Sequence, residues 1–355
     1  MPLPSSAGTR RLRKLTRTVK SESAGQRATS YDVAIAAGVA QSTVSRCFQP
    51  DSPISPDTRA HVMAIAGQLG YRPNALARSL ILGRSNVVGV IVTRYTLRNN
   101  PELLYALGEA LAAQCAKLLL IAVDSDNAVH STLRDALEFP LDGLISCATM
   151  TDGDIAGFRQ HGVPIVFLNR CVTSDGVDCI GTDNVHATRQ MADALHRAGH
   201  RRFVCIGGPR GAPVSEERVT GFVGRLRELG VTDVVTVTSD FSYDGGRTAF
   251  LKQAARSEQK IGAVFCANDQ LAFGALDACR FDLKLQVPED ISIVGFDDVA
   301  EAARPAYQLT TVRQQVEALA TQAVRLLGER LTEPRLRSRT ILLPGVLVRR
   351  VSAQI

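Results

Sequence analysis

Most of the chain alternates short apolar runs with longer amphipathic stretches, and this alternation limits the fold more than any other feature of the sequence. Val87–Val92, Leu118–Val123 and Ala263–Cys266 are almost wholly apolar, which is typical of strands buried on both faces. Amphipathic patterns such as Pro101–Ala113 and Val185–Ala198 lie between such runs and predict helices. Regular alternation of this kind indicates an α/β fold with two doubly wound parallel sheets, one after the other. Two such lobes form a cleft, which is the usual place for a small ligand.

Residues 28–72 carry a different pattern, that of three short helices. We expect Ser30 to cap the first helix and Gly38 to end it, because glycine enters a left-handed turn without a steric cost. A second helix follows from Gln41 to about Phe48 and has a polar outer face. These features are typical of a helix-turn-helix that binds DNA, although an ordinary three-helix bundle would show them too.

The third helix of this unit begins at Ser55 and Pro56, since serine is a preferred cap and proline suits the first helical position. Gly70 ends this helix. The residues predicted to form the core of the bundle are Val33, Ala34, Ala37, Val44, Phe48, Val62, Ile65, Ala66 and Leu69.

The formal charge of +6 is concentrated at the N-terminal end. Residues 1–80 hold 11 Lys and Arg against 4 Asp and Glu, and the rest of the chain holds 30 against 31. A basic head on a near-neutral body is expected of a protein that binds a polyanion such as DNA. Residues 1–27 lack periodicity and are rich in Arg, Lys, Ser and Thr, which predicts a disordered basic tail that adds to the same count.

Known catalytic and metal-binding motifs are missing from the sequence. It has no Gly-Lys-Ser/Thr phosphate loop, no GxSxG elbow, no HExxH pair and no kinase signature. His186, His196 and His200 are expected at the surface rather than on a metal, and the adjacent Asp297 and Asp298 are expected to point in different directions. We therefore expect a binding protein, not an enzyme, with no catalytic residues, no cofactor and no metal site.

The eight cysteines stand singly, mostly in apolar runs, and none has zinc-ligand spacing. We expect buried, reduced thiols, as in a cytosolic protein. The basic N-terminal stretch lacks the apolar core of a secretory signal, and no apolar run approaches the ~18 residues that a membrane helix needs. These observations predict a soluble, cytoplasmic protein without a membrane partner.

Three motifs in the head, taken in order, resemble the lactose-repressor/galactose-repressor (LacI/GalR) family of transcriptional regulators. They are Asp32–Val39, Ser42–Arg46 and Gly70–Leu80. Similar segments continue through the body at Asp142–Ile145, Gly199–Arg202, Glu217–Phe222, Ala267–Ala272, Pro288–Asp298 and Leu309–Val312. The resemblance covers about residues 28–350.

This resemblance implies a particular division of the chain. A helix-turn-helix DNA-binding domain would occupy 28–72, and a hinge helix with its linker would occupy 73–85. A periplasmic-binding-protein-like domain for effector binding and dimerisation would occupy 86–350. Its two lobes would consist of about 86–184 with 314–344 and about 185–313 with 345–350.

The resemblance also implies which residues contact DNA. Gln41, Ser42 and Arg46 lie on the exposed face of the second helix, which relatives place in the major groove. Asn74–Leu80 is expected to become helical only when two copies pack on DNA, with Leu80 as a wedge in the minor groove. The full set expected at the operator is Ser30, Gln41, Ser42, Thr43, Ser45, Arg46, Thr58, Asn74, Ala77 and Leu80.

The resemblance also implies an effector pocket, when the family's binding positions are transferred one by one to the matching residues of this chain. The pocket comprises Asn169, Arg218, Phe241, Asn268 and Asp297, with Thr93 and Gln314 at its edge. These side chains suit a polyhydroxylated ligand, since arginine donates in a fork, aspartate accepts from two hydroxyls and asparagine does both. The Phe241 ring offers an apolar face to the C–H side of a sugar. Asp and Asn at strand ends also often just cap helices, as we expect of Asp269.

The chain departs from the family after its first strand, where relatives commonly show Pro-Asp and then Asn-Pro-Phe-Phe. The equivalent run, Thr93–Asn100, replaces the aromatic wall with amides and adds Arg94 and Arg98. A more polar or anionic effector, such as a sugar acid or phosphosugar, is one interpretation. Arginines that simply face solvent are the other.

Together these features predict a homodimeric, ligand-controlled transcription factor that binds a near-palindromic double-stranded DNA operator and represses a sugar or sugar-acid utilisation operon. The rival is a solute-binding protein without a regulatory role, against which the missing export signal and the basic head argue. An enzyme is the weaker rival. The operator, the effector and the direction of the effector's action do not follow from the sequence.

Overall fold

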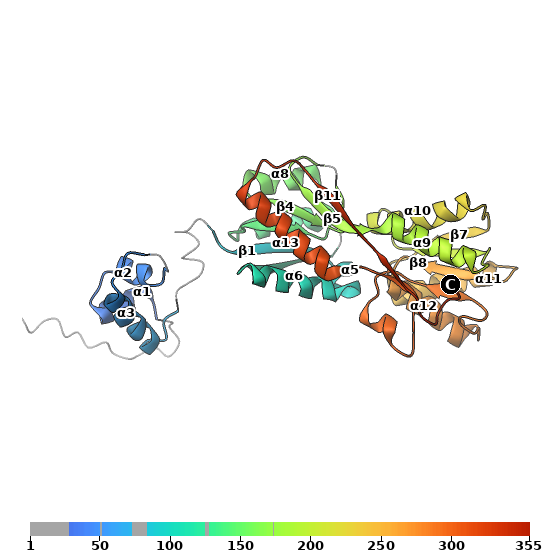
Figure 1. Ribbon diagram of the computed structural model, residues 1–355, viewed down its shortest axis with the longest axis horizontal. Coiled ribbons are helices and arrows are strands. Elements are labelled where there is room, and N and C mark those ends of the chain that lie inside the picture. Colours follow the sequence, from blue (N-terminus) through green and yellow to red (C-terminus); the bar gives the residue numbers. More distant parts are fainter. Residues whose placement is uncertain (1–27, 50–51, 73–83, 125–127, 173) are drawn as a thin grey trace, which may run out of the picture. The chain divides into compact units, whose positions relative to one another are not determined.

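The computed structural model describes residues 28–49, 52–72, 84–124, 128–172 and 174–355. The chain divides into two compact units, 1–82 and 83–355 (Figure 1). The expected basic tail at 1–27 and the expected hinge helix, with Asn74, Ala77 and Leu80, lie outside the described residues.

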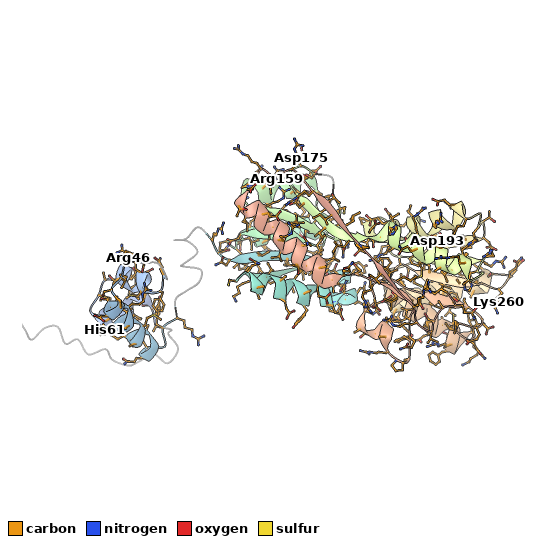
Figure 2. All side chains as sticks on the ribbon, in the orientation of Figure 1. Arg46, His61, Arg159, Asp175, Asp193 and Lys260 are labelled. Atoms are coloured by element: carbon orange, nitrogen blue, oxygen red, sulfur yellow. The ribbon has the colours of Figure 1, made fainter. Side chains whose placement is uncertain are left out.

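In the described part of the first unit, three helices form the bundle that the sequence predicts. They are α1 (Ser30–Ala37), α2 (Gln41–Cys47) and α3 (Pro56–Gln68). Gly38 follows α1 at φ 68°, in the left-handed region that is open to glycine. Ser55 caps α3 and Pro56 is its first residue, as predicted. Arg46 on α2 and His61 on α3 lie at the surface of this bundle (Figure 2).

One buried valine from each helix, Val33, Val44 and Val62, forms the centre of the bundle. The rings of Phe48 and Tyr71 pack edge to face at its margin, with 5.7 Å between their centroids. These contacts hold α2 against the other two helices by one face and leave its opposite face open.

Two details of this bundle differ from the prediction. Thr29, not Ser30, caps α1, because the Thr29 hydroxyl accepts from the backbone N–H of Asp32 and the Asp32 carboxylate accepts from the backbone N–H of Thr29. A cap residue needs extended backbone, and Ser30 is already helical. The sequence predicts Leu69 in the core, but Leu69 is 42% exposed. The reason is that α3 ends at Gln68, so Leu69 is the C-cap residue of this helix and lies at the surface.

Six strands among the described residues of the second unit form a parallel sheet in the order β11-β5-β4-β3-β1-β2, and this sheet with its helices is called lobe one. The strands are β1 (Val87–Thr93), β2 (Lys117–Val123), β3 (Gly143–Ser146), β4 (Ile165–Leu168), β5 (Asp178–Asp183) and β11 (Thr340–Pro344). One face is covered by α6 (Pro101–Ala113) and α13 (Val316–Thr332), and the other by α7 (Val129–Leu137) and α8 (Asp152–Gln160). The short α5 (Arg94–Asn99) follows β1 directly.

The second sheet, also parallel, has the order β7-β6-β8-β9 where the structure describes it, and with its helices it is called lobe two. Its strands are β6 (Phe203–Gly207), β7 (Val234–Thr238), β8 (Ala263–Cys266) and β9 (Ser292–Val294). The helices α9 (Asn184–Arg197) and α10 (Pro213–Glu228) cover one face, and α11 (Tyr243–Arg256) and α12 (Asp269–Asp277) the other. A π-helix η2 (Ala278–Asp282) continues α12, and a 3-10 helix η3 (Ala300–Ala303) follows β9. The predicted α/β fold with two doubly wound parallel sheets is confirmed.

Three crossings join the lobes in the described part of the chain: after β5, after β10 (Thr311–Arg313) and before β12 (Val346–Val348). β10 and β12 pair antiparallel, so two of the crossings lie side by side (Figure 1). Gly345 makes the last crossing possible, because a Cβ there would lie 2.6 Å from Val312 and 2.9 Å from Ala187. Four elements, α5, β5, α13 and β11, and this two-stranded ribbon were not expected from the sequence.

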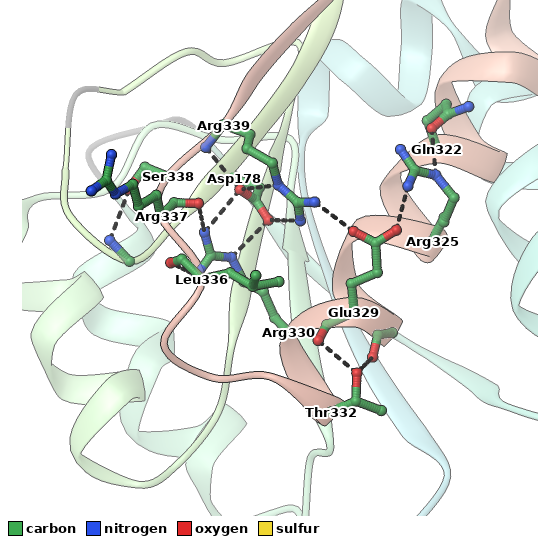
Figure 3. Close-up of polar contacts among 12 residues, drawn as sticks. Asp178, Gln322, Arg325, Glu329, Arg330, Thr332, Leu336, Arg337, Ser338 and Arg339 are labelled. Carbon is green, nitrogen blue, oxygen red and sulfur yellow. Dashed lines mark hydrogen bonds and ion pairs between the residues drawn. The ribbon is translucent and has the colours of Figure 1, made fainter.

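Asp178, the first residue of β5, is fully buried and ties three elements of lobe one together (Figure 3). Arg330 of α13 donates to both of its carboxylate oxygens, at 2.7 and 2.8 Å. Arg339, next to β11, donates to it through its backbone N–H at 2.9 Å and its guanidinium at 2.8 Å. Burial raises the pKa of Asp178, but the hydrogen bonds from Arg339 and Arg330 outweigh it, so the pKa lies below its ordinary value.

We expect Asp178→Asn to lower the free energy of unfolding by about 3–5 kcal/mol, because it leaves the buried Arg330 without its counter-charge. The matched control is Glu329→Gln, which removes a half-exposed partner of Arg339 and should cost about 0–1 kcal/mol. Urea unfolding of the full chain, followed by circular dichroism, measures both. Because the pKa of Asp178 is depressed, its contribution should be present at neutral pH and disappear as the pH falls through that pKa. Equal losses in the two variants would contradict this role of Asp178.

Candidate effector cleft and DNA-binding helix

A polar cleft lies between the two lobes of the second unit. Lobe one contributes Tyr95, Thr96, Asn99, Asn100, Leu103, Cys147, Leu168, Asn169 and Arg170 to its lining, and lobe two contributes Ala212, Val214, Arg218, Phe241, Asn268 and Asp297. Gln314, on a crossing between the lobes, completes the described lining. Six of the seven residues predicted for the effector pocket therefore lie around one cavity.

Four of these residues form a continuous chain of polar contacts from lobe one to lobe two. The Nδ2 of Asn169, just after β4, donates to Oε1 of Gln314 at 3.0 Å. The Nε2 of Gln314 donates to Oδ1 of Asp297 at 2.7 Å, and this oxygen lies 3.0 Å from Nη1 of Arg218 on α10. We call these four residues the relay. Thr182 of β5 also donates to Gln314, at 3.0 Å.

Arg218 is buried, with 4% of its surface exposed, and its guanidinium has partners at Nε and Nη1. Besides Asp297, it donates to Oδ1 of Asn184 at 3.0 Å and to the carbonyl of Ala267 at 2.7 Å. Its Cζ lies 3.7 Å above the centre of the Phe296 ring. Burial raises the pKa of Asp297, although the charge of Arg218 opposes this shift. A ligand that contacts Nη1 of Arg218 or Oδ1 of Asp297 must compete with the hydrogen bonds that these atoms already make.

Of the two residues that follow Ala267 after β8, the structure uses Asn268, not Asp269, as the cap of α12. Asn268 caps α12, accepting from the backbone N–H of Leu271 at 2.9 Å, and its Nδ2 donates to the carbonyl of Phe241 at 3.1 Å. Asp269, the expected cap, is instead the first helical residue. Its buried carboxylate accepts from the hydroxyl of Thr311 at 2.6 Å and from the backbone N–H of Val299 at 2.9 Å.

Two aromatic rings face each other across the cleft. Tyr95 of α5 and Phe241, in the loop after β7, pack edge to face with centroids 5.9 Å apart. The expectation that amides replace the aromatic wall is thus only partly right, since Tyr95 supplies a ring from the same run. Arg94 and Arg98 are exposed and absent from the described lining, in accord with the solvent-facing interpretation.

Thr93 is the one predicted pocket residue that the structure places elsewhere. It is 1% exposed and caps α5, accepting from the backbone N–H of Thr96 at 3.2 Å. It does not line the cleft as far as the described residues show. A threonine at the end of a strand before a short helix satisfies the first turn of that helix, and this local role keeps its hydroxyl from the cavity.

Asn99 and Arg170 line the cleft but were not named from the sequence. Asn99 is 9% exposed, and its Oδ1 has no hydrogen-bond partner among the described residues. Arg170 follows Asn169 and donates to its carbonyl at 2.8 Å. The run of amides was the only sequence signal for Asn99, and nothing in the sequence indicated Arg170.

Helix α2 presents the residues expected at DNA. Ser42 and Arg46 are exposed, whereas Gln41, Thr43 and Ser45 are half-buried. Gln41 donates to the Ser30 hydroxyl at 3.1 Å, which joins the start of α2 to that of α1. Thr58, in the first turn of α3, accepts from the Ser55 hydroxyl at 2.8 Å.

Arg59, for which the sequence indicated no role, stabilises the end of α2. Its guanidinium donates to the carbonyls of Cys47 and Gln49, at 2.6 and 2.8 Å. Of the two arginines on α2 and α3, Arg59 is therefore committed to the fold and Arg46 is left to solvent.

Other sequence expectations have mixed outcomes. Asp297 and Asp298 do point apart, since Asp298 pairs with Arg313 at 2.6 Å and Arg350 at 2.6 Å. Six cysteines are buried as predicted, but Cys115 and Cys171 are exposed. In the described residues no three His, Cys, Asp or Glu side chains gather where they could hold a metal, and no helix is long and apolar enough to cross a membrane.

The chain is similar to known proteins along nearly its whole length. Residues 29–74 match the model of the bacterial regulatory proteins of the lacI family, and residues 192–353 match that of the periplasmic binding protein-like domain. The ribose operon repressor of Escherichia coli (strain K12) is 30% identical over 331 residues, 92% of this chain and 100% of that protein. The regulator CelR of Thermobifida fusca is 32% identical over 320 residues, 86% of this chain and 93% of that protein.

Solved structures agree with these matches. The lac repressor dimer bound to operator and the anti-inducer ONPF has a TM-score of 0.83 at 26% identity, covering 92% of this chain and 99% of that chain. The complex of the transcriptional regulator CelR with cellobiose has a TM-score of 0.68 at 28% identity, covering 92% and 100%.

A helix-turn-helix unit joined to a two-lobed unit with a polar cleft defines a ligand-responsive, DNA-binding transcriptional regulator. Matches that run through both units show that this chain belongs to the LacI family of bacterial regulatory proteins. A solute-binding protein without a regulatory role is not supported, because the matches include the DNA-binding unit. The relatives named are transcription regulators rather than enzymes.

The relay predicts that Gln314 contributes more to the stability of the fold than its neighbour Gln315. Gln314→Leu should lower the free energy of unfolding by about 1–3 kcal/mol, because the buried amide of Asn169 and carboxylate of Asp297 each lose a partner. Gln315→Ala, which loses only one contact at the surface, to the carbonyl of Pro344, should change it by less than about 1 kcal/mol. Thermal unfolding of both variants checks this, and indistinguishable variants would show that the relay is not structurally important.

Proposed function

We propose that this protein is a homodimeric repressor of genes for the use of a sugar or sugar derivative. We further propose that this sugar or derivative binds in the cleft and changes the affinity of the protein for its operator. The observation that carries this proposal is the cleft lining, in which polar side chains from both lobes converge with two aromatic rings. Sugar effectors are suggested by the relatives, among them the ribose operon repressor and the CelR–cellobiose complex.

The chemistry of the cleft favours a ligand with several hydroxyl groups. The Asp297 carboxylate can accept from two hydroxyls, and Arg218 can donate to a ring or hydroxyl oxygen. The unpartnered Oδ1 of Asn99 needs a donor, which a sugar hydroxyl supplies. Tyr95 and Phe241 offer ring faces to C–H groups. Arg170 in the lining is compatible with a carboxylate on the ligand, so a sugar acid remains within this class.

On the DNA side, we propose that α2 enters the major groove. Ser42 and Arg46 would contact base edges together with Gln41. The helix would be positioned by contacts to the DNA phosphate backbone from Ser30, Thr43, Ser45 and Thr58. Two copies would bind a near-palindromic site, as the lac repressor dimer binds its operator. The proposed roles of Asn74, Ala77 and Leu80 concern residues outside those that the structure describes.

The experiment that tests the function is a gel shift of the full-length protein on the DNA that flanks its own gene, repeated with a panel of pentoses, hexoses, disaccharides and sugar acids. We expect a specific shift that competitor DNA of random sequence does not remove, and a change of that shift with one class of sugar. Binding that random DNA removes as easily as the flanking DNA would refute regulation at that locus.

Arg46→Ala should weaken operator binding about 5- to 150-fold, because a bidentate contact to guanine is worth roughly 1–3 kcal/mol. Arg46→Lys is the matched control, since it keeps the charge but not the fork and should retain non-specific binding. Fluorescence anisotropy on operator and random DNA measures both variants. Equal losses of Arg46→Ala on the two DNAs would contradict base reading by Arg46.

Phe241→Ala should lower the affinity for the effector found in the panel about 5- to 30-fold, because it removes one ring of the aromatic pair in the cleft. Its operator affinity without effector should stay within about twofold. Asp297→Asn is a second variant, which removes the carboxylate and also leaves the buried Arg218 without its counter-charge, so circular dichroism must first show that it folds. Phe139→Ala removes an exposed ring outside the described lining and serves as the control. Effector titrations that match the natural chain in both cleft variants would show that the effector binds elsewhere.

A further inference from the structure

Two cysteines lie on neighbouring segments beside the cleft. Cys179 is the second residue of β5 and pairs in register with Phe167 of β4. Cys171 lies in the segment that leaves β4, two residues beyond Asn169, whose backbone N–H donates to the carbonyl of Ile180 at 2.8 Å. The backbone pairing of β4 with β5 therefore continues to Asn169, two residues before Cys171.

The two thiols lie close together. The Sγ of Cys179 donates to the carbonyl of Val172, the neighbour of Cys171, at 3.5 Å, which brings the Cys171 thiol within reach of Cys179. Cys171 is exposed and Cys179 is 2% exposed. One sulfur of the pair is thus open to small molecules in solution and the other lies directly behind it.

A hydrogen bond between the two thiols favours a reactive form of the pair. The bond from Cys171 lowers the pKa of the Cys179 thiol to about 7, although burial opposes the shift. The same bond raises the pKa of the Cys171 thiol well above its ordinary value, so the first proton of the coupled pair leaves Cys179 and the exposed Cys171 keeps its own. The thiolate is the form of cysteine that reacts with oxidants.

We propose that Cys171 and Cys179 form a reversible disulfide when the protein meets a peroxide. As the Cys171 sulfur attacks one oxygen of hydrogen peroxide and breaks the O–O bond, the Cys179 thiolate takes up the Cys171 proton. The products are a sulfenic acid on Cys171 and hydroxide, which takes up a proton to become water. The Cys179 sulfur then attacks the Cys171 sulfur, and the sulfenic hydroxyl leaves as a second water. The peroxide gains the two electrons that the sulfurs lose, and a dithiol reductant returns them.

The position of this disulfide links it to the effector cleft. Cys171 directly follows Arg170, which lines the cleft, and Asn169 of the relay precedes both. A disulfide would fix this segment to β5 beside the cavity. The disulfide itself does not depend on the proposed effector site, but its effect on effector binding does.

The test treats the reduced full-length protein with hydrogen peroxide, denatures it, labels the remaining thiols with N-ethylmaleimide and maps the peptides by mass spectrometry. We expect a peptide pair joined through Cys171 and Cys179, with two hydrogens fewer than the reduced pair, that dithiothreitol separates again. Cys115→Ser should leave the joined pair intact, because Cys115 is the other exposed thiol and only serves as a competing target.

Single variants make the outcome decisive. Cys171→Ser should leave Cys179 fully labelled, since the buried thiol then lacks the exposed partner. Cys179→Ser should leave Cys171 as a sulfenic acid that dimedone traps. Full labelling of both thiols in the natural chain, under conditions that oxidise Cys115, would overturn the proposal. So would oxidation of Cys171 that proceeds to a sulfinic acid without joining Cys179. If the disulfide forms but effector titrations do not change, the proposed disulfide is confirmed and only its effect on effector binding is refuted.

Discussion

A buried guanidinium–carboxylate pair, Arg218 with Asp297, is the interaction on which the organisation of the cleft depends. Their side chains are only 5% and 7% exposed, and charges in such surroundings are tolerated when they are paired and fully hydrogen-bonded. The groups nearby are arranged for this purpose, since the carbonyl of Ala267 accepts from Arg218 and Gln314 donates to Asp297. Because Gln314 also contacts Asn169 of lobe one, the state of the pair is connected to the arrangement of both lobes.

This arrangement decides what effector binding can achieve. A ligand gains little net free energy by replacing hydrogen bonds that already exist, whereas a donor that reaches the unpartnered Oδ1 of Asn99 gains a new one. A ligand shifts the balance between two arrangements of the lobes only by its difference in affinity for them. The relay gives that difference a structural basis, because contacts with Asp297 compete directly with the bond to Gln314.

Local signals in the sequence predicted local structure well. Asn100 and Pro101 set the start of α6, and both ends of this helix agree with the prediction. The errors arose where neighbouring residues compete for one role, as Thr29 and Ser30 do at α1 and Asn268 and Asp269 do at α12. Propensity alone does not distinguish such neighbours, because the choice depends on which residue has extended backbone.

Long-range structure left little trace in the sequence. The bond between Asn169 and Gln314 joins residues 145 positions apart, and no periodicity indicates it. Six of the seven residues that the family resemblance supplied reach the cleft, but it misplaced Thr93 and did not include Arg170, whose position depends on the loop after β4. Tyr95 was visible as a residue type, yet its orientation follows from α5, a helix too short to be recognised by its pattern.

The contacts of Asp178 also set the order in which the chain can reach its final form. Its two arginines lie at 330 and 339, whereas lobe two occupies most of the sequence between β5 and α13. On the ribosome the chain emerges from its N-terminus, so the four-stranded sheet of lobe two is complete while lobe one still waits for a helix and a strand. Until Arg330 arrives, the carboxylate of Asp178 must stay hydrated, and the β5 edge of the lobe one sheet is unpaired. A nascent chain stalled in this interval would expose that edge, which makes the last part of synthesis the period in which it most needs protection from aggregation.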